Sequence, residues 1–452
     1  MHFLDGAKLS ILWGIPFIGI LLSIALFPLL ARHFWHRHYG KVALFWSVAL
    51  LVPLGFAEGF EITARAMLAT ALREYLPFII ILFALFTLAG GILVSGEIRS
   101  GPTNNTAILA IGTLGASIIG TTGASMILIR PLLRANKGRR HQVHVVIFFI
   151  LLVSNIGGAL TPLGDPPLFV GFLRGVDFFW TAKNLWQQTT IVAGILLVVF
   201  FVLDWWLARK AENRPGPRDA TSPIRVRGKI NFLLIAGIIA IVLMSAAWKP
   251  GAITVYGVAL ESQNLARDTA LLIIALLSLL LTPSEHREGN DFSWEPIREV
   301  AILFAAIFTC IIPVIAMLEA GRNGPFASLL RFVTEPDGTP HEVAYFWLTG
   351  LLSAFLDNAP TYLVFFELAG GDAQALMGPL AGTLAAISMG AVYMGALTYI
   401  GNAPNFMVYA IAEERGVRMP NFFAYLLWAS LVLVPLFLLL TLLPVAPILK
   451  SY

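Results

Sequence analysis

Residues 158–169 read GALTPLGDPPLF, and residues 395–406 read GALTYIGNAPNF. Seven of the twelve aligned positions are identical. Each copy places Gly, Pro, Thr and an Asp or Asn inside an apolar segment that is long enough to cross a bilayer. Because hydrocarbon cannot satisfy free backbone groups, a helix broken there must be enclosed by protein or line a cavity. Corresponding breaks in two halves of a membrane protein indicate a transporter's binding site.

The composition predicts an all-α polytopic membrane protein. Hydrophobic residues make up 58% of the chain and charged residues 12%, against roughly 25% charged residues in soluble domains. Apolar runs of spanning length recur from end to end. The net charge of +4 reflects loop Lys and Arg residues, which the positive-inside rule explains without a nucleic-acid partner. Residues 10–31 are expected to form a first transmembrane helix and not a cleaved signal.

A hydrophilic linker at residues 208–229 divides the chain into two halves, residues 1–207 and 230–452, with six apolar segments in each. We expect about ten spans and two re-entrant hairpins. The first half would contain a hairpin at about residues 104–133 and a broken helix at about 143–173. The second half would contain a hairpin at about 342–368 and a broken helix at about 376–411.

Lys and Arg bias gives the expected topology. The basic stretches 32–41 and 130–140 and the central linker should be cytoplasmic, and the acidic-leaning residues 58–74 should form an external loop. A re-entrant hairpin at 104–133 keeps all the basic stretches inside. The alternative is one long helix followed by a basic external loop. We expect an integral protein of a bacterial cytoplasmic (inner) membrane, with both termini external.

The same plan occurs twice. The offset of 237 residues that aligns the two GALT strings also aligns 120–125 with 357–362, which are both clusters of small and polar residues. Because the second half would start on the same side as the first half ends, the two plans would have opposite orientations. The sequence therefore predicts an inverted-topology repeat.

The first break carries chemistry that suits a small cation. Its prolines free upstream carbonyls, and these would combine with the Thr161 hydroxyl, the Asp165 carboxylate and the Asn155 amide into a site of hard oxygen ligands. The second break and the two hairpin tips would supply similar groups. The further candidate site residues are Gly157, Thr121, Thr122, Ser125, Asp357, Asn358, Thr361, Thr398 and Asn402.

Asp165 and Asp357 are the central candidates. A carboxylate at bilayer depth costs roughly 3 kcal/mol on insertion scales. Such a group can hold a proton or a metal cation, and exchange between the two is antiport. The Na⁺ candidates are Asp165, Asn155, Asp357 and Asn358. The alternative interpretation is an ordinary interfacial turn with a helix-capping Asp.

Three strings carry a family resemblance: SNIGGALTPLGDPPLF (154–169), GTTGASMILIRPLLRANK (120–137) and LDNAPTYLVFFELA (356–369). They resemble NhaD-type sodium:proton antiporters of the ion transporter superfamily, which also includes arsenite exporters and citrate or dicarboxylate carriers. The resemblance implies a scaffold domain, a mobile transport domain with elevator-type motion, and a homodimer. It also implies ion-path roles for Asp165, Asn155, Thr161, Asp357, Asn358, Thr361 and Asn402.

Two transport functions remain open at this stage. The first is exchange of Na⁺ (or Li⁺) for H⁺, with no cofactor, with Na⁺ and H⁺ as the transported ions, and with small inorganic ions and the lipid bilayer as partners. The second is sodium-coupled transport of citrate or a dicarboxylate, although the tips TTGAS and DNAPT differ from the Ser-Asn-Thr tips of the carboxylate carriers. A third possibility, an intramembrane aspartyl protease using Asp165 and Asp357, requires a Gly where Pro162 stands.

Overall fold

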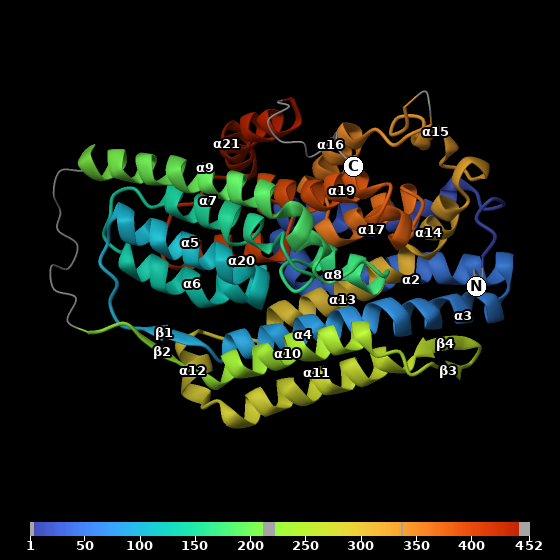
Figure 1. Ribbon diagram of the computed structural model, residues 1–452, viewed down its shortest axis with the longest axis horizontal. Coiled ribbons are helices and arrows are strands. Elements are labelled where there is room, and N and C mark those ends of the chain that lie inside the picture. The colour runs from blue at the N-terminus through green and yellow to red at the C-terminus, as the bar shows by residue number, and fades with distance from the viewer. Residues whose placement is uncertain (1–3, 211–221, 336–337, 443–452) are drawn as a thin grey trace.

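The computed structural model describes residues 4–210, 222–335 and 338–442. The described chain is a bundle of helices with two short two-stranded sheets (Figure 1). Seven of its helices are long and apolar enough to cross a membrane, and an eighth span results if α13 and α14, which meet at 43°, count as one. The all-α polytopic class is therefore confirmed. Shorter apolar helices lie at 143–158, 342–355 and 381–397.

The helices of residues 4–210 include three long helical stretches, a pair of helices that pack together, a helix followed by irregular backbone, and a last long helix. They are α1 (Ile15–Leu30), α2 (Arg32–Glu58), α3 (Phe60–Thr70), α4 (Leu76–Gly90), α5 (Pro102–Ile119), α6 (Thr121–Ala135), α7 (Val143–Leu152), α8 (Pro166–Leu173) and α9 (Trp180–Lys210). A π-helical turn, Ala71–Tyr75, joins α3 to α4, so residues 60–90 form one continuous helix.

The expected external loop at residues 58–74 is wrong, because most of it is helical. Thr63, Ala66 and Ala69 are buried at a spacing of three residues and give α3 one packed face. Glu61 and Arg65 form an i,i+4 ion pair of 2.6 Å on the other face. Charges that suggested a loop instead decorate the outer side of an amphipathic helix.

The second half has a similar order of longer helices, with the short helices α12, α15 and α18 between them. Its helices are α10 (Ile230–Ala247), α11 (Ser262–Leu281), α12 (Ser284–Gly289), α13 (Glu295–Cys310), α14 (Ile312–Glu319), α15 (Ala327–Leu330), α16 (Glu342–Phe355), α17 (Asn358–Leu368), α18 (Ala373–Met377), α19 (Ala381–Met394), α20 (Ala403–Glu414) and α21 (Phe422–Leu442). Strands β3 (Ala252–Val255) and β4 (Val258–Glu261) form a hairpin between α10 and α11.

Strand β1 (Leu93–Ser95), after α4, pairs antiparallel with β2 (Arg225–Arg227), just before α10. This sheet joins the segment after α4 to the end of the linker at one end of the bundle (Figure 1). The predicted linker at 208–229 includes residues 211–221, which lie outside the described residues, as do the chain ends 1–3 and 443–452.

Two helical pairs reverse direction inside the bundle. Between α5 and α6 the chain turns at Gly120, whose φ of +81° is in the left-handed region that favours glycine. The two helices pack together and lie side by side in Figure 1. In the second half, α16 packs against α17, and the chain turns between them at Leu356 and Asp357.

The broken helices lie at the centre of the molecule. Residues 144–152 of α7 and all residues of α19 are buried. In contrast, α9, α10 and α11 expose many large apolar side chains, as lipid-facing helices do. Because α7 and α19 lie in the interior, the irregular backbone that follows each of them is also surrounded by protein.

We expect residues 99 and 137, at the two ends of the α5–α6 pair, to face the same side of the membrane. Arg99→Cys and Lys137→Cys should react with a membrane-impermeant thiol reagent from one side, and Tyr256→Cys from the other. Tyr256 is 85% exposed in the turn between β3 and β4, and α10 separates that turn from β2. The native Cys310 is fully buried and should stay unlabelled. Labelling of residues 99 and 137 from opposite sides would mean that this segment spans the bilayer.

Candidate functional site

Each broken helix contains a short 3-10 turn followed by irregular backbone. In the first half α7 ends at Leu152, the 3-10 turn covers Ile156–Gly158, and α8 begins at Pro166. In the second half α19 runs into the 3-10 turn Gly395–Leu397, and α20 begins at Ala403. A proline in the first turn of α8 and of α20 fits, because those positions need no backbone N–H.

Glycines at matching positions allow each break to fold back on itself. A Cβ added to Gly164 would lie 2.2 Å from the Gly158 carbonyl oxygen. A Cβ added to Gly401 would lie 2.6 Å from the carbonyl oxygen of Gly395. The two breaks therefore have the same internal contact, and a side chain at either position would push the backbone apart.

Threonine hydroxyls fasten each break to the neighbouring helical pair. The Thr161 hydroxyl donates to the Ser117 carbonyl oxygen on α5. The Thr398 hydroxyl donates to the Ala354 carbonyl oxygen on α16 at 2.5 Å. In both halves the partners are 44 residues apart. These two predicted site residues therefore have backbone partners and position the breaks.

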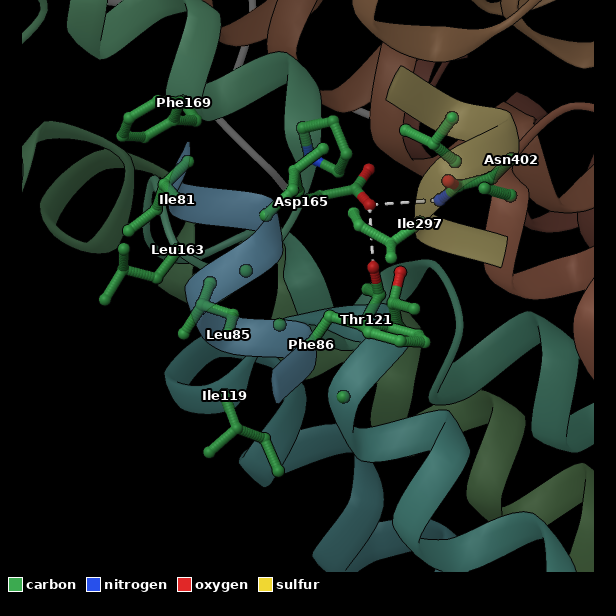
Figure 2. A pocket seen from close by; sticks show the side chains of 18 of the residues that line it. Ile81, Leu85, Phe86, Ile119, Thr121, Leu163, Asp165, Phe169, Ile297 and Asn402 are labelled. Carbon is green, nitrogen blue, oxygen red and sulfur yellow. Dashed lines mark hydrogen bonds between the residues drawn. The ribbon is translucent and has the colours of Figure 1, made fainter. Parts of the chain in front are cut away.

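Asp165 lies where both halves meet. Its side chain is 1% exposed. Its Oδ1 accepts hydrogen bonds from Thr121 Oγ1 and Asn402 Nδ2, both at 3.0 Å, and its Oδ2 accepts one from Asn358 Nδ2 at 2.6 Å. Figure 2 shows the Asp165, Thr121 and Asn402 side chains pointing toward one another. Thr121 and Asn358 belong to the two turns, and Asp165 and Asn402 to the two breaks.

All four residues stand at helix N-termini, namely those of α8, α6, α20 and α17. Asp165 is the residue before α8, but its side chain makes no capping hydrogen bond with that helix. The helix-capping interpretation of Asp165 is therefore wrong for this residue. The carboxylate instead faces donors from three other helices.

A chain of amides extends from this carboxylate. Asn402 Nδ2 also lies 3.2 Å from the Ser154 carbonyl oxygen and 3.4 Å from Asn155 Oδ1. Asn155 donates to Asn405 Oδ1 at 2.7 Å, and Asn405 donates to the carbonyl oxygens of Gly395 and Thr398. Each break thus supports the other through side-chain amides.

One buried oxygen beside Asp165 lacks a partner. Asn358 is fully buried, and its Oδ1 has no hydrogen-bond partner among the described residues. An unpaired buried acceptor is costly unless a ligand, ion or water satisfies it. The amide nitrogen of the same side chain donates to Asp165 Oδ2, so this unpartnered oxygen belongs to a residue in direct contact with the carboxylate.

Asp357 is placed differently from Asp165. It is half-buried and caps α17, with its Oδ1 accepting from the Ala359 backbone N–H at 3.1 Å. The capping interpretation therefore holds for Asp357. Asp357 and Asp165 nevertheless line the same small cavity, which has a volume of about 80 Å³ and a wall of Ile81, Leu85 and Phe86 from α4 (Figure 2).

The other predicted residues lie around this centre. Thr122 lines the cavity, Ser125 shares a 2.8 Å hydrogen bond with Ser154, and the Thr361 hydroxyl donates to the Asp357 carbonyl oxygen. Gly157 has a packing role, because a Cβ there would lie 2.5 Å from the Thr113 carbonyl oxygen. Sequence reasoning missed Ser117, whose hydroxyl donates to the Gly157 carbonyl oxygen at 2.5 Å. Ser117 lies on an unbroken apolar helix and carries no signal in the sequence.

The charge of the cavity is set by carboxylates. Among the described residues that line it, none is Lys, Arg or His. The described part of the chain also contains no group of three His, Cys, Asp or Glu side chains that could hold a metal. A cation at this site would be held by one or two carboxylates and neutral oxygens.

Buried polar groups at paired helix breaks, in a bundle of membrane-spanning helices, define a membrane transport protein. Comparison with known families agrees. The profile of a family described as "putative citrate transport" matches residues 6–445, and the chain belongs to that family. A protein of Synechocystis sp. named "uncharacterized transporter" is 24% identical over 407 residues, which cover 84% of this chain and 80% of that protein. The family and the relative are transporters and not enzymes, so the protease hypothesis is discarded.

The close contact between Gly164 and the Gly158 carbonyl oxygen in the first break gives a stability prediction. Gly164→Ala should lower the Tm of the detergent-solubilised protein by several degrees, because overpacking of this kind typically costs about 1–3 kcal/mol. Gly194→Ala is the matched control, since nothing lies within 4 Å of a Cβ at that position in the middle of α9. It should leave Tm unchanged or raise it. Equal changes in Tm for the two variants would contradict the close contact between Gly164 and Gly158.

Proposed function

We propose that this protein is a secondary active transporter that exchanges Na⁺ (or Li⁺) for H⁺ across the bacterial cytoplasmic membrane. The observation that carries the proposal is the fully buried Asp165 carboxylate, shared by the two halves of the chain, with the unpartnered Asn358 oxygen beside it. The two functions that remain after the protease is discarded are both transport functions, and the site favours a cation as the transported species.

The ligand chemistry supports a small monovalent cation. Carboxylate, amide and backbone carbonyl oxygens are hard ligands that suit alkali and alkaline-earth ions. Asp165 supplies the charge, Asn358 Oδ1 supplies a free acceptor, and the breaks supply carbonyl groups close by. No cationic side chain competes for the carboxylate among the described residues of the cavity wall.

Proton coupling follows from the same carboxylate. A buried charge is costly unless it is paired. When the cation leaves, a proton can neutralise Asp165, and when a cation binds, that proton must leave. The proton and the cation compete for the same carboxylate. Each time the site moves across the membrane it therefore carries either a proton or a cation, and the net result is exchange.

Alternating access by an elevator-type motion is supported by the duplicated parts. Each half has a pair of helices that turns inside the bundle. In each half a threonine hydroxyl bonds the break to a carbonyl oxygen 44 residues earlier on that pair, and a glycine lets the break fold back on itself. We propose that these parts form an inverted repeat and move as one transport domain against α1, α2, α4 and α13. A homodimer is implied by the resemblance to the NhaD-type antiporters.

A sodium-coupled citrate or dicarboxylate carrier is the second candidate. The family description favours it, and so do the four helix N-termini around the site, because helix N-termini attract anions. Against it, Asp165 already places a negative charge at that point, and an anionic substrate would meet a like charge at close range.

Replacement of the central carboxylate tests the proposal. In everted vesicles, Asp165→Asn should abolish Na⁺-induced collapse of a preformed pH gradient, because an amide holds neither a proton nor the charge that attracts the cation. Asp372→Asn, which removes an exposed carboxylate that caps α18, is the control and should retain activity. Uptake of labelled citrate by wild type, without Na⁺-induced proton movement, would favour the carboxylate carrier.

The free amide oxygen gives a second test. Asn358→Ala should raise the half-saturating Na⁺ concentration about tenfold, which corresponds to ~1.4 kcal/mol of lost binding free energy. Asn104→Ala, which removes an exposed amide bonded to the Arg99 carbonyl oxygen, should have no effect. An unchanged Na⁺ dependence in Asn358→Ala would remove that oxygen from the site.

A further inference from the structure

A second, larger cavity opens beside the Asp165 site. Its volume is about 440 Å³. It shares Asp357, Asn402 and Met407 with the smaller cavity, so the two adjoin. Its walls come from α1, α2 and α13 on one side and from α6 and α20 on the other, that is, from both sides of the division proposed above. We call this cavity the vestibule.

The vestibule is acidic. Its acidic lining residues are Asp291, Glu295, Glu299, Asp357 and Glu414, and its basic ones are Arg130 and His36. Near the mouth, Asp291 is already neutralised, since its Oδ2 contacts Arg130 Nε at 3.2 Å and Arg415 Nη2 at 2.6 Å. Farther in, Glu299 and Asp357 face a wall that is otherwise largely apolar, including Val300, Leu303 and Phe304.

Glu299 is held on this wall by a specific contact. Its Oε1 accepts a hydrogen bond from the Trp35 indole Nε1 at 3.0 Å, and Trp35 is 3% exposed. Glu299 stands one helical turn before the buried Leu303, so the two side chains share the face of α13 that lines the vestibule. The indole is a neutral donor, so it occupies one carboxylate oxygen without pairing Glu299 with a positive charge.

We infer that the vestibule is the cytoplasmic access path to Asp165 and that Glu299 gathers cations on this path. This inference rests on the proposed function. Arg130 indicates the side of the membrane to which the vestibule opens. It lines the vestibule and begins the basic stretch 130–140, which the positive-inside rule places in the cytoplasm. A carboxylate in a cleft with apolar walls focuses its field along the cleft and raises the local cation concentration.

A purely structural role for Glu299 would have different consequences. The bond to Trp35 joins α13 to α2, so its loss could loosen the scaffold without any effect on cations. Trp35→Phe removes the bond and keeps the charge, whereas Glu299→Gln removes the charge and keeps an acceptor oxygen for the indole. Comparison of the two variants separates electrostatic attraction from helix packing.

The experiment measures Na⁺-dependent proton movement in vesicles of both orientations. In everted vesicles, where Na⁺ meets the cytoplasmic face, Glu299→Gln should raise the half-saturating Na⁺ concentration by about 3- to 10-fold and leave the rate at saturating Na⁺ nearly unchanged. In right-side-out vesicles the Na⁺ dependence should stay that of wild type. Glu299→Asp should restore most of the affinity. Glu285→Gln, an exposed change on α12 outside the vestibule, is the charge-matched control and should behave as wild type.

Several outcomes would overturn the inference. These are an unchanged Na⁺ dependence in Glu299→Gln, an equal shift from both faces, a shift only from the outer face, or an equal shift in Glu285→Gln. A Trp35→Phe variant that reproduces the effect of Glu299→Gln would assign Glu299 to packing and also reject it. Failure of the proposed function is distinct, because wild type itself would then show no Na⁺-dependent proton movement.

Discussion

The constraint on which this structure depends is that lipid cannot hydrogen-bond to free backbone groups. Two breaks in the middle of apolar segments expose such groups, so the rest of the chain must surround them. The α5–α6 and α16–α17 pairs do this, and Thr161 and Thr398 fasten each break to its pair through one hydrogen bond. Enclosure also explains why α7 and α19 are buried on all sides while α9 and α10 face outward.

The two halves match in backbone contacts but differ in charge. Aligned positions pair Thr161 with Thr398 and Gly164 with Gly401, yet they also pair Asp165 with Asn402 and Thr121 with Asn358. One half thus contributes the carboxylate, and the other contributes amides that donate to it. If the aligned positions carried identical residues, each half would form its own site, and the two sites would be equivalent. The substitutions instead join both halves at a single carboxylate.

Much of this centre could be predicted from the sequence, because its signals are local. Breaker residues in apolar segments located both breaks, and polar residues in them identified Asp165, Asn358 and Asn402. Two kinds of feature could not be found in this way. Ser117 bonds to Gly157 across 40 residues from within a regular helix. Glu299 meets Trp35 across 264 residues, and only the packing of α13 on α2 reveals that contact.

Local signals also failed where charge was read as exposure to water. Residues 58–74 have enough acidic and basic side chains to suggest a loop, but Thr63, Ala66 and Ala69 bury one face of a helix. The π-helical turn at 71–75 then keeps this helix continuous with α4. Charges on one side of a helix and in a loop give similar local composition, and only the spacing of the small buried residues distinguishes them.

The number of carboxylates at the Asp165 centre limits the charge of the ion that the centre can neutralise. If Asn402 were an aspartate, two carboxylates would lie about 3 Å apart, and they could not both remain ionised without a strongly charged ligand. The amide avoids this conflict and leaves Asp165 as the one carboxylate in the hydrogen-bonded centre, with the capping Asp357 at the cavity edge. The four helix N-termini around Asp165 place partial positive charge close to this carboxylate. The proposed exchange of a monovalent cation for a proton is consistent with the single carboxylate of this hydrogen-bonded centre.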